Sequence, residues 1–278
     1  MKNLVISVAA PKGGVGKTTT AVNLAAGLAL KNKKTLIIDV DPSGYCSSAF
    51  GYDEEKIFGN VMDLYKHSKN VHEVIHKTEL PLLEIIPFEK IGYEDEVTFN
   101  SLTVDKTVLK KAIEEVKSEY DYIILDCPPF LYGSTVNSLI ASDYLIIPVK
   151  SSKFSLEAVQ KMMIFVEEIK KDANPNLKVD GLLLTMHELN TKASFQIKKE
   201  LYKLYPNQMF KTAIPKNTSV AESTFYNKPI LLHDSSAIAS KAYFNFVDEL
   251  IDKHETHTLM SISGFDNFDF LDEDHSEV

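Results

Sequence analysis

Short, nearly continuous runs of apolar and β-branched residues recur along the chain. Seven such runs lie at Leu4–Ala10, Thr35–Asp39, Leu82–Pro87, Tyr122–Asp126, Tyr144–Val149, Leu182–Thr185 and Phe210–Ile214. Runs that do not alternate between apolar and polar residues are typical of strands buried on both faces of a parallel sheet. Between them, residues 104–120 and 156–171 repeat apolar residues at the spacing of one helix face. This alternation predicts a doubly wound α/β fold, with a mostly parallel sheet and helices on both faces.

The periodic pattern continues to about Lys253 and then stops. From His254 to the end the chain has seven acidic residues and no lysine, and Phe265, Phe268 and Phe270 stand among aspartates. Such a segment cannot bury enough apolar area to fold alone. We therefore expect a single domain over residues 1–253 and an acidic, aromatic-containing disordered tail over residues 254–278.

Composition narrows the class of protein. Of 278 residues, 44% are hydrophobic, which supports a sizeable core and excludes global disorder. No apolar run approaches the roughly 18 residues of a membrane span, and the apolar start is too short for a signal peptide. Two cysteines are too few for a disulfide framework or a metal cage. We expect a cytoplasmic protein.

The charge pattern restricts how phosphate can be bound. The chain has 39 acidic and 30 basic residues, and every basic residue is lysine. Without arginine there can be no arginine finger and no guanidinium readout of bases, so lysine, backbone N–H groups or a metal must meet phosphate charge. Because seven of the acids lie in the tail, the remainder is close to neutral and nucleic-acid binding is not excluded.

A glycine-rich loop follows the first predicted strand and opens a predicted helix over residues 17–30. The loop reads Lys12, Gly13, Gly14, Val15, Gly16, Lys17, Thr18 and Thr19. In this strand–loop–helix context it is a P-loop, whose glycines let backbone N–H groups approach phosphate at a helix N-terminus. We expect Lys17 to reach the β- and γ-phosphates of a nucleotide and Thr18 to ligate Mg²⁺.

The full motif is more specific than a P-loop. Lys-Gly-Gly-Val-Gly-Lys-Thr-Thr-Thr resembles the deviant Walker A motif of the ParA/MinD superfamily. Residues 126–129, 181–186, 210–217 and 221–223 also look like segments of ParA/Soj-type partition ATPases. The resemblance reaches about Lys253. It implies a P-loop NTPase that binds ATP and Mg²⁺, forms a homodimer with ATP and hydrolyses it slowly.

The resemblance also implies partners and a cellular role. A ParB-like or other adaptor protein would stimulate hydrolysis, and the switch would partition or position DNA or a protein cargo. Association with the nucleoid would follow from non-specific DNA binding.

Site residues follow from the same resemblance. Lys12 would cross the dimer interface to the partner's nucleotide and so replace an arginine finger. Asp126 would belong to the Mg²⁺ shell as the Walker B carboxylate, Asp39 would support the metal through water, and Asp41 would orient the attacking water. Met186 and Pro215 would lie in the adenine-contacting region.

The chain departs from the partition pattern at the positions that bind DNA. At the matching arginine positions it has Asn190, Lys216, Ser219, Ser236 and Ile238, of which only Lys216 is basic. DNA binding is therefore not implied residue by residue.

Residues 190–216 give an independent reason to consider DNA, since they hold six lysines and one acid. A helix over Ala193–Tyr205 would turn Ile197, Leu201 and Leu204 to the core. Lys192, Lys199 and Lys203 would share another face, and with Lys216 they are candidate contacts for non-specific DNA. An ordinary solvated face is the alternative.

Two other functions stay open. A MinD-type membrane-associated positioning ATPase needs a basic amphipathic C-terminal helix, whereas this tail is acidic, so we expect no membrane binding. A metabolic P-loop enzyme is disfavoured by Lys12 and by the partition-like second half.

One further motif has a simpler explanation than metal binding. The five residues from His72 to His76 match a zinc-protease pattern, but no third ligand follows. We expect a peripheral helix there.

Overall fold

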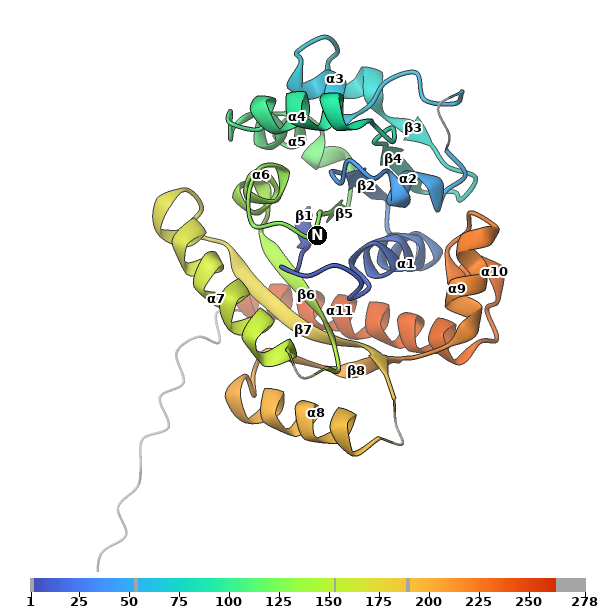
Figure 1. The fold of residues 1–278 in the computed structure, drawn as a ribbon, viewed down its shortest axis with the longest axis vertical. Helices are drawn as coiled ribbons and strands as arrows, with labels where there is room; N and C mark the ends of the chain where they lie inside the picture. Colours follow the sequence, from blue (N-terminus) through green and yellow to red (C-terminus); the bar gives the residue numbers. More distant parts are fainter. Residues whose placement is uncertain (1–2, 53–54, 153, 189–190, 264–278) are drawn as a thin grey trace, which may run out of the picture.

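The core of the protein is one eight-stranded sheet, in a computed structural model that describes residues 3–52, 55–152, 154–188 and 191–263 (Figure 1). The strands lie in the order β3-β4-β2-β5-β1-β6-β7-β8. Their bounds are β1 Leu4–Val8, β2 Thr35–Asp39, β3 His76–Lys77, β4 Leu83–Ile86, β5 Tyr122–Asp126, β6 Tyr144–Lys150, β7 Lys178–His187 and β8 Met209–Pro215. Every neighbouring pair is parallel except β3 and β4. The predicted doubly wound, mostly parallel sheet is confirmed.

Helices cover both faces of this sheet. Those of the described residues are α1 Lys17–Leu30, α2 Tyr45–Ser48, α3 Val61–Tyr65, α4 Tyr93–Leu102, α5 Val108–Val116, α6 Ser134–Ala141, α7 Ser155–Asp172, α8 Lys192–Leu204, α9 Thr218–Phe225, α10 Ile230–His233 and α11 Ile238–Ser263, with 3₁₀ turns η1 Val71–Val74 and η2 Lys117–Glu119. Helices α1, α10 and α11 pack in one apolar cluster. Helices α3, α5, α6 and α7 pack in the other. None of the described helices combines the length and apolar character needed to cross a membrane.

The apolar periodicity gives the correct buried faces. On α5, Val108, Ala112, Ile113 and Val116 are buried, as the spacing predicts. On α1, small side chains let α11 approach closely, and a Cβ added at Gly27 would lie 2.6 Å from Val247 Cγ2. The central strands are buried on both faces, so their unbroken apolar runs are satisfied by a helical layer on each side.

The folded part extends beyond Lys253, where we expected it to end. Helix α11 continues to Ser263. His254 is buried, with Nε2 lying 3.0 Å from Asp180 Oδ2 and its ring edge-on to Tyr144, and Glu255 accepts from Lys33 Nζ at 2.7 Å. Polar pairing holds these residues, which is why apolar periodicity missed them. Residues 264–278 of the predicted tail lie outside the described residues.

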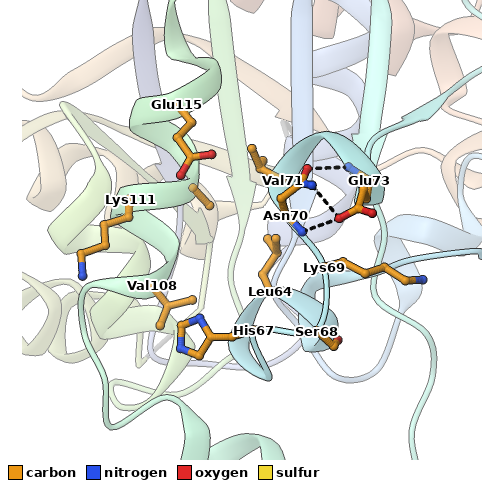
Figure 2. Close-up of a pocket in the computed structure, with 11 residues that line it drawn as sticks. Leu64, His67, Ser68, Lys69, Asn70, Val71, Glu73, Val108, Lys111 and Glu115 are labelled. Carbon is orange, nitrogen blue, oxygen red and sulfur yellow. Dashed lines mark hydrogen bonds between the residues drawn. The ribbon is translucent and has the colours of Figure 1, made fainter.

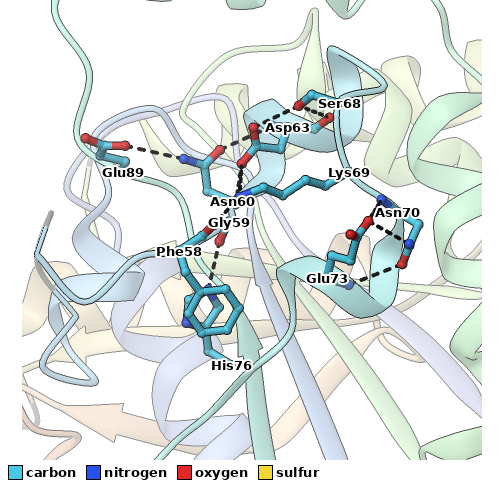
Figure 3. A network of polar contacts seen from close by, with 10 residues as sticks. All are labelled: Phe58, Gly59, Asn60, Asp63, Ser68, Lys69, Asn70, Glu73, His76 and Glu89. Carbon is cyan, nitrogen blue, oxygen red and sulfur yellow. Dashed lines mark hydrogen bonds and ion pairs between the residues drawn. The ribbon is translucent and has the colours of Figure 1, made fainter.

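The five residues from His72 to His76 do not form the expected peripheral helix. An Asn70–Glu73 capping box starts only the 3₁₀ turn η1, and His76 then enters β3. His76 stacks on Phe58, with ring centroids 3.7 Å apart, and its Nε2 hydrogen-bonds the Gly59 carbonyl at 2.8 Å (Figure 3). Among the described residues no group of three or more His, Cys, Asp or Glu side chains is placed to hold a metal.

Candidate nucleotide and magnesium site

The P-loop and two aspartates meet at the carboxyl edge of the central strands. In the sheet register, Val8 of β1 pairs with Asp126 of β5, and Asp39 of β2 pairs with the same Asp126. The P-loop leaves β1 beside them. Ligands of doubly wound sheets bind at this edge, where the strand order reverses.

The loop leaves a helix N-terminus open to an anion. Gly14 and Gly16 have φ of 68° and 86°, in the left-handed region that favours glycine. Gly16 is the N-cap of α1, no side chain caps the helix, and its first turn has no acid. The first N–H groups of α1 therefore have no side-chain acceptor and can bind phosphate. Thr185 of β7 fixes the loop by donating to the Val15 carbonyl at 2.7 Å.

Lys17 is a largely buried cation at the base of this loop. Lys17 is only 7% exposed, and its Nζ donates a hydrogen bond to the Lys12 carbonyl at 3.2 Å. Burial lowers the pKa of Lys17, while the charges of Asp126 and Asp41 oppose that shift. A desolvated ammonium gains more than an exposed one from a phosphate beside it.

Asp126 lacks the partners that a buried carboxylate requires. Both oxygens are buried, and neither accepts a hydrogen bond from the described residues. Burial raises the pKa of Asp126 well above its usual range, Asp39 raises it further, and the nearby Thr18 hydroxyl and Lys17 act in the opposite direction. Orphaned carboxylate oxygens beside a threonine hydroxyl fit Mg²⁺, which is bound by one or two carboxylates and substrate phosphates.

Asp39 is equally buried but is held by hydrogen bonds. Its Oδ2 accepts from the Ser47 amide at 2.9 Å and from Ser47 Oγ at 2.8 Å, and Oδ1 accepts from the Asp41 amide at 3.2 Å. Burial still raises its pKa, to about 7. Asp41 itself is half-buried and accepts from the amide and hydroxyl of Ser43 at 3.0 and 2.7 Å.

The P-loop, Asp41 and Met186 line one cleft of about 630 Å³. Thr18 and Thr19 belong to the same lining. Met186 has φ of 48°, while Pro215 lies at the end of β8 opposite His187 and does not line this cleft. Their adenine contacts stay predictions.

Sequence reasoning missed several residues of the site. Ser47 and Thr185 hold its parts in place, and Tyr45, Lys90 and Phe130 line the cleft. Thr185 belongs to the segment 181–186 that resembles partition ATPases, but nothing in the sequence marks its contact with the P-loop. The other four residues carry no motif of their own, so only the folded chain brings them together.

The side chain of Lys12, unlike that of Lys17, lies outside the nucleotide cleft. It is exposed, and its Nζ lies 5.2 Å from the centroid of the Phe154 ring. It lines a separate hollow of about 240 Å³ between the P-loop and α7. The Lys12 ammonium is thus outside the cleft of its own chain.

The candidate DNA-contacting lysines fall into two groups. Lys192, Lys199 and Lys203 are exposed on α8, whereas Lys216 pairs with Glu188 at 2.8 Å. Leu201 is buried as predicted, but Leu204 is 51% exposed, because the helix ends there and the chain turns toward β8. Asn190 lies outside the described residues.

Another cavity, of about 370 Å³, lies between the end of α3, η1 and α5 (Figure 2). Its lining residues include four charged ones, Lys69, Lys111, Glu73 and Glu115, beside apolar ones such as Leu64 and Val108. Glu73 is already engaged by the Asn70 amide, and none of these side chains has a buried, unpaired polar atom. The candidate phosphate and metal site is therefore the P-loop with Asp126, and this cavity offers no comparable set of groups.

The fold and this cleft define a P-loop ATPase, and comparison agrees: residues 3–179 match the family model described as AAA domain. The chain is 36% identical over 249 residues to the sporulation initiation inhibitor protein Soj of Bacillus subtilis (strain 168), covering 88% of this chain and 97% of Soj. It is 34% identical over 247 residues to the chromosome partitioning protein ParA of Myxococcus xanthus (strain DK1622), covering 89% and 87%. The chain belongs to the ParA/Soj family of partition ATPases, in the ParA/MinD superfamily.

The same fold occurs in a solved structure that has a low sequence identity to this chain. Cobyrinic acid a,c-diamide synthase from Mycobacterium smegmatis, with bound ADP and magnesium, aligns with a TM-score of 0.78 at 23% identity, covering 91% of this chain and 96% of that one. At this identity the likeness shows the fold alone.

Proposed function

We propose that the protein is a Mg-ATP-dependent dimerising ATPase switch that partitions or positions DNA or a protein cargo. The observation that carries this proposal is the uncapped N-terminus of α1, with buried Lys17, beside the orphaned carboxylate of Asp126. A triphosphate would occupy the first and a divalent cation would satisfy the second. ADP and magnesium bound to a structural neighbour of the same fold support this choice of ligands.

Each site residue then has a distinct task. Gly13, Gly14, Val15, Gly16 and Thr19 surround the phosphates with N–H groups, and Lys17 neutralises their charge. Thr18 and Asp126 would hold Mg²⁺, with Asp39 behind them. Bound Mg²⁺ would neutralise charge on the β- and γ-phosphates. Asp41 lines the cleft from a half-buried position, which suits orientation of an attacking water.

Dimerisation would bring Lys12 to the partner's nucleotide. The chain has no arginine, so a cation supplied in trans must be a lysine. Lys12 is exposed and lies outside its own cleft, over Phe154. A second copy facing the cleft could accept it without any change in the P-loop backbone.

We further propose non-specific DNA as the surface that the ATP-bound dimer binds, through Lys192, Lys199 and Lys203. The chromosome-partitioning relatives and the exposure of these lysines support it. Lys216 would contribute only after leaving Glu188. An adaptor protein would then stimulate hydrolysis and release the dimer.

Two variants test the switch on a sizing column. Asp41→Ala should bind ATP, fail to hydrolyse it and accumulate as a dimer. Lys12→Ala should bind ATP with similar affinity, because the backbone N–H groups of the P-loop are unchanged. It should stay a monomer, because it lacks the cation that would contact the partner's nucleotide. A Lys12→Ala protein that dimerises with ATP as the parent does would refute the role of this lysine in trans.

Sedimentation with plain DNA and with anionic liposomes separates the proposed surface from a membrane. Pelleting with DNA alone, and only with ATP, is the expected result. Pelleting with liposomes would favour the membrane-associated alternative. Transfer of phosphate to a small molecule would favour a metabolic enzyme.

A further inference from the structure

One face of α8 combines exposed lysines with an exposed phenyl ring. Lys192, Phe195, Gln196, Lys199 and Lys203 recur at the three- and four-residue spacing that places side chains on one helix face, and all are exposed. We call these five residues the α8 lysine face. Phe195 is 68% exposed, and no ion pair of the described residues involves the three lysines.

The last residues of the chain are complementary to this face in charge and in apolar content. Residues 264–278 contain six acids and no lysine, and Phe265, Phe268, Phe270 and Leu271 alternate with aspartates. They lie outside the described residues, so only their sequence enters the argument. Acids would meet the lysines, and an aromatic side chain would meet Phe195.

Helix α11 contacts the start of β8, the strand that follows α8, ten residues before its own end at Ser263. Tyr202 of α8 donates to the Phe210 carbonyl at 3.3 Å, and Lys253 of α11 lies 5.2 Å from the centroid of the Phe210 ring. The carboxyl ends of α8 and α11 lie on the same side of the molecule (Figure 1). The fifteen residues 264–278 span about 50 Å when extended, whereas a helix of 13 residues is about 20 Å long. The segment is therefore long enough to cross a gap of about 30 Å from Ser263 and still follow α8 from Lys203 to Lys192.

We propose that residues 264–278 dock along the α8 lysine face of their own chain. The tether makes the contact intramolecular, at an effective concentration in the millimolar range for a short linker, so a weak contact suffices. The docked segment covers the lysines that we propose for DNA, and it therefore acts as a brake on DNA binding. The brake rests on the proposed function, whereas the docking does not.

Lysine footprinting tests the docking in the full chain without DNA. A variant with the tail acids changed to amides (Asp266, Asp269, Asp272 and Asp274 to Asn, Glu273 and Glu277 to Gln) is acetylated beside the parent, and peptide masses report each lysine. Lys192, Lys199 and Lys203 should react several-fold faster in the variant. Lys110 and Lys111, exposed on α5, should react equally in both and serve as internal controls.

The apolar part of the contact is tested separately. Phe195→Ser in the parent chain should speed acetylation of Lys199, while Phe225→Ser, another exposed phenylalanine on α9, should not. The protection should fade at 0.5 M salt, where charges are screened within about 5 Å. Equal rates for parent and tail variant at low salt would overturn the proposal.

DNA binding then separates this proposal from the proposed function. If the tail variant binds DNA several-fold more tightly than the parent at low salt, the docked segment is a brake. Faster acetylation in a protein that binds no DNA would keep the docking and remove DNA from the proposed function. Unchanged acetylation in a protein that binds DNA with ATP would remove the docking and keep DNA in the proposed function.

Discussion

Asp39 and Asp126 are paired in register on neighbouring strands, yet their surroundings differ. Ser47 gives Asp39 two hydrogen bonds, and its Oγ in turn accepts from the Phe88 amide at 2.9 Å. Asp126 has no such support. This difference suits a metal site in which Asp126 ligates the metal directly. Asp39, held in place by Ser47, would add negative charge behind it. The cost of burying an unpaired carboxylate is borne by the nucleotide-free protein.

That cost predicts a pH-dependent gain in stability for Asp126→Ala. The raised pKa of Asp126 means that its proton is held more tightly in the folded state, so its destabilising effect grows as pH rises above about 4. Without nucleotide and with a chelator present, the variant should be more stable than the parent at pH 8, by about 1–3 kcal/mol, the cost of an unsatisfied buried group. The difference should shrink at pH 5. Urea unfolding at both pH values measures it.

A control variant and a measurement of stabilisation by Mg-ATP complete this test. Glu222→Ala, at an exposed position inside α9, changes the net charge equally and should leave stability nearly unchanged. Stabilisation by Mg-ATP should be smaller in Asp126→Ala than in the parent. A variant less stable than the parent at pH 8 would contradict an unpaired charge at this position.

The sequence predicts the residues of this site unequally. Lys17 and Thr18 are adjacent in a contiguous motif, so their meeting point does not depend on the rest of the fold. Asp39 and Asp126 needed the family resemblance, because their register is set by strands far apart in sequence. Ser47 had no signal at all, because a serine is a common residue and its role arises from a hydrogen bond made only in the fold. Thr185 was marked only by the resemblance of its segment, and its hydrogen bond to the P-loop could not be read from the sequence.

At the scale of elements, the sheet was predictable because its strands are buried on both sides. All seven predicted runs became strands, and the two-residue β3 was too short to leave a pattern. The end of α11 was misjudged at Lys253, since Asp180, His254 and Lys33 hold it through polar contacts. Apolar periodicity reports packing against a core and does not register such pairs.

The contact between β7 and β8 predicts a strong effect of one methyl group. A Cβ at Gly181 would lie 2.6 Å from Phe210 Cε2 and 3.0 Å from the Gln208 carbonyl oxygen. The Phe210 ring cannot easily move, because Phe246 packs edge-on against it and Lys253 lies over it. Gly181→Ala should therefore lower the free energy of unfolding by about 1–3 kcal/mol.

Gly92→Ala is the control for this substitution. Gly92 precedes α4 with φ of −76°, and a Cβ there would meet nothing within 4 Å. Gly92 is the N-cap of α4, where alanine is somewhat less favourable, so the unfolding midpoint in urea should fall far less than that of Gly181→Ala. Equal midpoints for Gly181→Ala and the parent would show that β8 shifts freely along β7.

At the scale of the whole molecule, the nucleotide cleft and the α8 lysine face lie on separate elements of one sheet. Lys12 lies in the loop after β1, and the cleft is lined by the segments after β1, β2, β4 and β5 and by Met186 of β7. Helix α8 joins β7 to β8 at the sheet edge. Thr185 lies near the carboxyl end of β7, the strand that leads into α8, and it donates a hydrogen bond to the Val15 carbonyl of the P-loop. It therefore connects the nucleotide cleft to the strand that precedes α8. Dimerisation would place two α8 lysine faces in one particle, so the nucleotide can control DNA binding by avidity without moving either face.

This arrangement predicts a difference in salt dependence between monomer and dimer. Each phosphate contact contributes about −0.9 to the slope of log K against log salt concentration. With the tail acids changed to amides, so that no acidic segment neutralises them, the three lysines of each chain give a slope of about −3 for ATP-bound Lys12→Ala, which should stay a monomer. Asp41→Ala, trapped as a dimer, should give about −5 when both faces contact one duplex. In either background Lys199→Glu with Lys203→Glu should flatten the slope, whereas Lys110→Glu with Lys111→Glu on α5 should not. Fluorescence anisotropy with a short duplex measures all of these slopes, and equal slopes for monomer and dimer would show that only one face of the dimer reaches DNA.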